Sequence, residues 1–186
     1  MNERKVKNMK KIVVALLLSQ LCLIYGQDQN PATLKSILLE QLRTVHNQKD
    51  WFVPVNIAVE GLTPEQAKWK DKSGNHSVSE LVNHLIFWNG RALEKFQGQK
   101  TAAFDGNHEE TFTKSMESVE WTAAVQKLDS IMAAWEKAVE GADDAKLQKW
   151  ASTIAHIGTH TAYHTGQIVY IRRLQGSWDP EKGVKS

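Results

Sequence analysis

The chain has a single cysteine, Cys22, and only four prolines among its 186 residues. Because Cys22 lies in the N-terminal segment, the rest of the chain can form no disulfide and offers no thiol nucleophile of its own. No stretch alternates apolar and polar residues as a half-buried strand does, and no internal repeat is evident. These absences exclude a disulfide scaffold and a cysteine-based enzyme, and they leave an all-helical protein as the expected fold class.

The N-terminal segment carries basic residues ahead of an apolar stretch over residues 12–25; the basic residues are Arg4, Lys5, Lys7, Lys10 and Lys11. This order predicts a secretory signal peptide over residues 1–26, with Gly26 as the small residue before the cleavage point. The apolar stretch is shorter than the ~20 residues of a membrane-spanning helix, so an uncleaved anchor is the less favoured alternative. We therefore expect an exported protein, periplasmic or extracytoplasmic, with one domain over residues 27–186.

The positive charge of the chain belongs to this leader. The full chain has a formal net charge of +2 at pH 7. Five of its 23 Lys and Arg and one of its 21 Asp and Glu lie in residues 1–26, so residues 27–186 carry 18 basic and 20 acidic side chains, a net charge of −2. Without a basic patch we expect no nucleic-acid partner, and we expect membrane contact only through the leader if it is retained.

Apolar residues with helical spacing predict four long helices. The first begins near Pro31 and extends toward Phe52, where Pro54 ends or kinks it. A short turn of helix starts after Thr63, and the capping-box pattern of Ser77 and Glu80 opens a second long helix over about 78–96. Two more helices span about 125–139 and about 146–174. The natural architecture for such helices is an antiparallel four-helix bundle.

Three histidines recur at every fourth residue of the last predicted helix, at His156, His160 and His164. Side chains four residues apart lie on one side of a helix, where neighbouring pairs can bind one metal ion. His160 and His164 share an apolar stripe with Ile157 and Ile168, so both should point into the bundle. His156 lies at the edge of that stripe and is expected to be structural or supporting. The spacing alone also fits polar histidines without a metal.

A further histidine, His84, lies on the apolar face of the predicted 78–96 helix, beside Leu81 and Trp88. A histidine on an apolar face needs a polar partner, and a metal shared with His160 and His164 would supply one.

Segment 98–115 has no sustained period and is expected to be a long loop whose Phe104 and Phe112 cover a site. The other histidines, His46, His76 and His108, lie in polar contexts and are expected to be exposed.

Two segments of the chain resemble the DinB-like (YfiT-related) superfamily of metal-binding four-helix bundles. The first runs from Gly61-Leu62-Thr63-Pro64-Glu65 to Trp69, and on through Ser77-Val78-Ser79-Glu80-Leu81-Val82-Asn83-His84-Leu85 to Trp88. The second is His156-Ile157-Gly158-Thr159-His160-Thr161-Ala162-Tyr163-His164-Thr165-Gly166-Gln167-Ile168.

The resemblance implies one divalent metal ion, zinc or nickel, held by His84, His160 and His164. Thr165 stands where members of the superfamily often have an arginine before the glycine and glutamine. Members are often dimers, so the resemblance also makes a homodimer a candidate state.

Three imidazole ligands would leave coordination positions open for water or substrate. We therefore hypothesise an exported, metal-dependent hydrolase that attacks a small-molecule substrate with metal-activated water, although no residue is identified as its general base. Gln167 and Tyr163 are expected either to line the site or to pack. The alternatives are a non-catalytic ligand- or metal-binding protein, a metal-free interaction module, and a thiol-dependent transferase like other members of the superfamily. Export disfavours the last, because small thiols are chiefly intracellular.

Overall fold

The computed structural model describes residues 31–112 and 118–184, and all regular structure in these ranges is helical. The compact unit begins at Leu34. The predicted signal peptide lies outside the described residues, so its cleavage and the export of the protein stay predictions. Among the helices that are described, none has the length and apolar character needed to cross a membrane.

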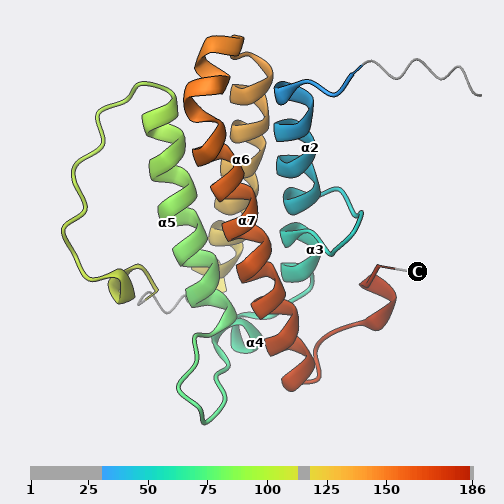
Figure 1. Ribbon diagram of the computed structural model, residues 1–186. Helices are drawn as coiled ribbons and strands as arrows, with labels where there is room; N and C mark the ends of the chain where they lie inside the picture. Colours follow the sequence, from blue (N-terminus) through green and yellow to red (C-terminus); the bar gives the residue numbers. More distant parts are fainter. Residues whose placement is uncertain (1–30, 113–117, 185–186) are drawn as a thin grey trace, which may run out of the picture. The chain divides into compact units, whose positions relative to one another are not determined.

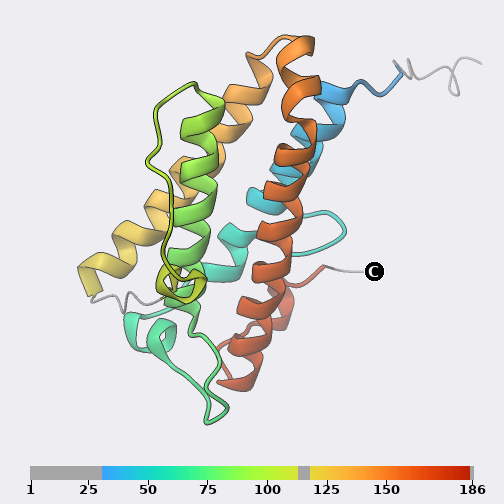
Figure 2. The same cartoon turned by 60° about the vertical axis from the view of Figure 1, so that its left-hand side comes forward.

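Four long helices make up the bundle: α2 (Leu34–His46), α5 (Val78–Phe96), α6 (Ser118–Glu140) and α7 (Asp144–Leu174). α2 and α5 each pack against both α6 and α7 (Figure 1). The all-helical prediction is confirmed. Among the four packed pairs of long helices, α2 with α6 and α5 with α7 are antiparallel, whereas α2 with α7 and α5 with α6 are parallel. The packed neighbours are therefore not all antiparallel as predicted, because the chain that follows α5 returns along that helix before α6 begins (Figure 2).

Side-chain caps fix where the helices of the site begin. The hydroxyl of Ser77 accepts a hydrogen bond from the backbone N–H of Glu80, and the Glu80 carboxylate accepts one from the N–H of Ser77, as the sequence predicted for the start of α5. The same reciprocal pair starts the short helix α4 (Pro64–Lys68) at Thr63. Asp143 caps α7 by accepting from the N–H of Lys146.

The main departures from the predicted helices lie in the first third of the chain. α2 is shorter than predicted, and a separate short helix, α3 (Val55–Val59), follows it. Pro54 directly precedes α3 and has the extended backbone of an N-cap residue, so it starts a helix as well as ending the preceding segment. The described part of the 98–115 segment contains a 3₁₀ turn, η1 (His108–Thr111), and a second such turn, η2 (Pro180–Lys182), follows α7.

The core lies between the four long helices. Its fully buried side chains include Leu42, Leu85, Leu128, Met132, Trp135, Ile154 and Ile168. The indole N–H of Trp135 donates to the backbone carbonyl of Asn89, and the Asn89 amide donates to Oγ1 of Thr161. These buried hydrogen bonds join α5 to α6 and to α7, and they fix the rotation of the two helices that carry the site histidines.

Candidate metal centre

Three histidines from two facing helices bring their Nε2 atoms together inside the bundle. His84 comes from α5, and His160 and His164 come from α7. Nε2 of His160 lies 3.0 Å from Nε2 of His84 and 3.0 Å from Nε2 of His164. All three candidate ligand atoms lie within 4.8 Å of one another. The structure therefore brings the three predicted residues into one cluster that could hold a metal ion.

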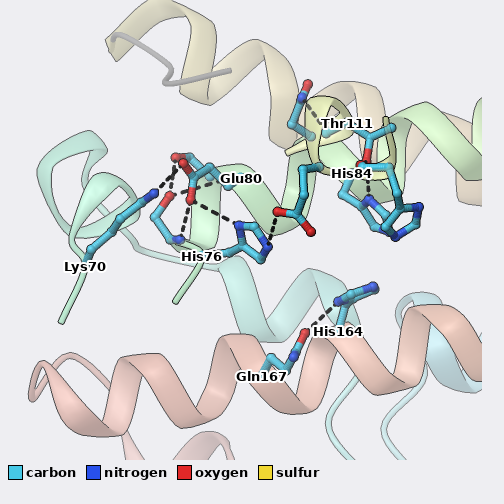
Figure 3. Close-up of polar contacts among 12 residues, drawn as sticks. Lys70, His76, Glu80, His84, Thr111, His164 and Gln167 are labelled. Atoms are coloured by element: carbon cyan, nitrogen blue, oxygen red, sulfur yellow. Dashed lines mark hydrogen bonds and ion pairs between the residues drawn. The ribbon is translucent and has the colours of Figure 1, made fainter. Parts of the chain in front are cut away.

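A threonine fixes the tautomer of His84 (Figure 3). Oγ1 of Thr111 donates its proton to the backbone carbonyl of His108 at 2.7 Å, so it can only accept from the imidazole. Nδ1 of His84 lies 2.6 Å from that oxygen and must therefore carry the ring proton. As a result, Nε2 of His84 presents a lone pair to the cluster.

A glutamine has the same effect on His164. Nδ1 of His164 lies 2.6 Å from Oε1 of Gln167, an amide oxygen that can only accept, so Nδ1 donates and Nε2 keeps its lone pair (Figure 3). The amide nitrogen of Gln167 in turn donates to the hydroxyl of Tyr163 at 3.4 Å. The structure thus places Gln167 beside the site rather than in packing alone, and it acts there by orienting a candidate ligand.

The chemistry of this donor set fits a divalent metal ion. The lone pairs of His84 and His164 both face Nε2 of His160, which can carry at most one proton. In a neutral cluster at least one buried acceptor then lacks a donor, which folded proteins avoid. A cation at the centre would satisfy all three nitrogens, and neutral imidazole is the form that binds zinc and nickel.

Burial keeps these imidazoles neutral. It lowers the pKa of His84 to about 3, with further contributions from the neighbouring His164 and His160. It also lowers the pKa of His160 to about 4, again with a contribution from His164. The pKa of His164 is lowered by burial as well, although its hydrogen bond to Gln167 opposes that shift. Protons therefore compete weakly with a metal at neutral pH.

Aromatic rings hold the ring plane of His84. Phe112 stacks on it with ring centroids 3.9 Å apart and planes 7° apart, and His76 stacks on the other side of Phe112 at 3.8 Å. The amide of Asn83 donates to the backbone carbonyl of Thr111 at 2.9 Å, which ties η1 to α5. Phe112 therefore packs against the candidate ligand His84, whereas Phe104 packs against Trp88. Thr111, the neighbour of Phe112, supplies a hydrogen bond that the sequence did not predict.

The cluster opens onto a pocket of about 470 Å³. Its lining consists of Trp88, His108, Thr153, His156, Ile157, Thr159, His160 and Tyr163. Of the two alternatives for Tyr163, the structure places it in the pocket lining, and His156 is exposed in the pocket wall rather than part of the cluster. None of the residues that line this pocket in the described ranges is acidic.

Of the three histidines expected to be exposed, only His108 is. His46 is 2% exposed, with Nδ1 at 2.5 Å from Oε1 of Glu136 and Nε2 at 3.0 Å from Oδ1 of Asp129. His76 is half-buried in the aromatic stack. The two carboxylates that surround His46 are seven residues apart on α6, and only the packing of α2 against α6 shows that a histidine lies between them.

The fold and the cluster together define a class: all-helical bundles with a candidate metal centre between facing helices. The model of one family, the DinB superfamily, matches residues 55–168, which is more than half of the chain, and the chain belongs to this superfamily. This match confirms the resemblance found in the sequence, and it includes His84, His160 and His164. Comparison with curated proteins and with solved structures finds no match.

Proposed function

We propose that the protein is a metal-dependent hydrolase whose divalent ion, zinc or nickel, is bound by Nε2 of His84, His160 and His164. The observation that carries this proposal is the meeting of three Nε2 atoms, two of which have their lone pairs fixed by hydrogen bonds at Nδ1. A bound ion of this kind supplies Lewis acidity, which lowers the pKa of water and polarises substrate oxygens. Three protein ligands leave the open position that distinguishes catalytic from closed structural sites.

The side chains of the pocket supply the proton acceptor. Two imidazoles, of His108 and His156, are exposed in the described lining and could accept a proton. We assign the role to His108, whose ring centroid lies 5.0 Å from that of His84. A neutral imidazole at this place can take a proton from the nucleophile and return it to the leaving group.

The pocket walls support a neutral substrate with an apolar substituent. Trp88, Ile157 and Tyr163 provide apolar and aromatic surface, and no lysine, arginine or carboxylate in the described lining would pair with a charged group. We therefore propose a small ester or amide as the substrate class.

Hydrolysis of a panel of small esters and amides by the zinc- and nickel-loaded protein tests this function. We expect His164→Ala to lose both metal and turnover, and His156→Ala, on the same helix, to retain the metal. His108→Ala should retain metal but lose about 100-fold or more in turnover. A loaded protein that hydrolyses nothing on the panel faster than the metal-free protein would refute the hydrolase and favour a non-catalytic binding protein. Turnover that requires an added small thiol would favour a transferase.

We also propose that the protein acts outside the cytoplasm. The support is the basic segment followed by the apolar residues 12–25 and Gly26. Sequencing the N-terminus of protein recovered from the exporting cell should find a chain that starts near residue 27. A chain that retains Met1 and stays in the cytoplasm would contradict export.

A further inference from the structure

A second pocket, of about 530 Å³, lies between α6 and the chain segment that contains α3 and α4. It shares no lining residue with the pocket beside His160. Trp121, Val125 and Asp129 follow one another at four-residue spacing along its α6 wall, and Val59 and Leu62 lie in the opposite wall. Its volume is within the roughly 300–1,000 Å³ of small-molecule sites.

The carboxylate of Asp129 is held in place at one part of this pocket. Nε2 of His46 lies 3.0 Å from its Oδ1, and the amide of Asn56 donates to the same oxygen at 2.5 Å. In the part of the chain that the structure describes, both contacts fall on Oδ1, so Oδ2 keeps its capacity to accept. The side chain of Asp129 is half exposed, and hydrogen bonds from His46 and Asn56 lower its pKa, so the group is an accessible anion at neutral pH.

The walls of the pocket are fixed before any ligand arrives. The indole of Trp121 is 4% exposed, and its N–H donates to the backbone carbonyl of Leu62 at 3.0 Å. The buried guanidinium of Arg172 donates to the carbonyls of Ala58 and Glu60 at 2.6 and 3.0 Å, which holds the end of α3. Such preformed walls reduce the entropy lost on binding.

Charge in the pocket favours a cation. Its two acidic residues are Asp129 and Glu60, and the Glu60 carboxylate already pairs with Lys182 at 2.8 Å. No lysine, arginine or histidine belongs to the described lining. His46 contacts Glu136 as well as Asp129, so at most one positive charge is shared by two carboxylates. Asp129 is therefore the acidic group that an incoming ligand would meet, beside apolar surface from Val125 and the other apolar lining residues.

We propose that this pocket binds a small organic cation, a primary amine that carries an apolar or aromatic body. The ammonium group donates to Asp129, and the body packs against Val125 and the other apolar lining residues, next to the edge of Trp121. A carboxylate accepts more strongly from an ammonium group than from a neutral donor, so the charge on the ligand determines affinity. The site requires no metal and does not depend on the proposed hydrolase activity.

Titration of the purified protein with phenethylamine, followed by calorimetry and by the indole NMR signal of Trp121, tests the proposal. We expect saturable binding of the amine. Phenethyl alcohol, which has the same body without the charge, should bind at least about tenfold more weakly than the amine. Phenylacetate should not bind. Absence of saturable binding by the amine, or equal affinity for the amine and the alcohol, would overturn the proposal.

Two variants that both touch His46 separate the pocket from the surrounding network. Asp129→Asn removes the charge that lines the pocket and should weaken amine binding about tenfold, whereas Glu136→Gln changes the other carboxylate at His46 and should change binding less than twofold. An equal loss in both variants would contradict direct binding to Asp129. Gln126→Phe adds bulk at an exposed lining position, should also weaken binding, and keeps the test decisive if Asp129→Asn does not fold.

Discussion

Replacing Thr111 by valine removes the hydroxyl that orients His84 and should weaken metal binding without changing any candidate ligand. The two side chains have nearly the same shape, so the change removes the acceptor at 2.6 Å from Nδ1 and the hydroxyl's own hydrogen bond to the His108 carbonyl, without moving a candidate ligand. Because His84 is only 1% exposed, water cannot replace that acceptor. Without this acceptor the Nδ1–H tautomer of His84 is no longer favoured, and Nε2 no longer presents a fixed lone pair to the cluster.

The expected loss of zinc affinity is about 10- to 100-fold, the usual cost of removing a partner that orients a histidine ligand. This corresponds to about 1.4–2.8 kcal/mol. Gln167→Ala removes the equivalent partner of His164, but Gln167 is only partly buried, so water can take its place. We therefore expect Gln167→Ala to lose less than about tenfold.

Competition for zinc against a chromophoric chelator at about pH 7 measures both variants. Thr111→Ser keeps the hydroxyl and serves as the matched control, and circular dichroism establishes that each variant is folded. If Thr111→Val binds zinc as tightly as Thr111→Ser while folded, the hydrogen bond at Nδ1 does not prepare His84 for a metal and the reasoning fails.

Three further predictions concern stability. In the metal-free protein, burial lowers the pKa of His84 to about 3 and of His160 to about 4, below their usual 6.5. As the pH falls from about 6.5 to 4, the unfolded chain therefore gains protons at these histidines that the folded chain does not. The free energy of unfolding, measured with urea, should fall over this pH range. A constant or rising free energy of unfolding would be inconsistent with buried neutral histidines. His46→Leu should lower the free energy of urea unfolding by about 2 kcal/mol, because it leaves two carboxylates of α6 facing an apolar side chain. A decrease below about 0.5 kcal/mol would disprove a stabilising role of His46. Ser77→Ala should lower the free energy of unfolding by about 1 kcal/mol, because it removes the N-cap of α5. An unchanged urea midpoint would show that the cap is dispensable.

Much of the fold could be predicted because its signals are local. The caps at Thr63 and Ser77 involve residues three positions apart, and both start helices where predicted. The mixed direction of the helices could not be predicted, because it depends on the path of a long connection with no periodic pattern. The short helix α3 was missed because Pro54 both ends one segment and starts the next.

In the site, too, local patterns were visible in the sequence and contacts between distant segments were not. The i, i+4 spacing of His160 and His164 and the apolar surroundings of His84 were visible in the sequence, and the structure brings these residues together. Thr111 carried no signal, since a threonine in a polar loop gains its role only when that loop folds back onto α5. The burial of His46 likewise depends on contacts with residues more than 80 positions away.

Elemental analysis of the purified protein measures directly whether His84, His160 and His164 hold a metal. The protein should be purified without a metal-affinity column, beside His164→Ala and the matched control His156→Ala. We expect about one zinc or nickel ion per chain in the wild type and in His156→Ala, and none in His164→Ala. A wild-type protein that takes up no metal even after reloading, or an undiminished metal content in His164→Ala, would contradict this expectation.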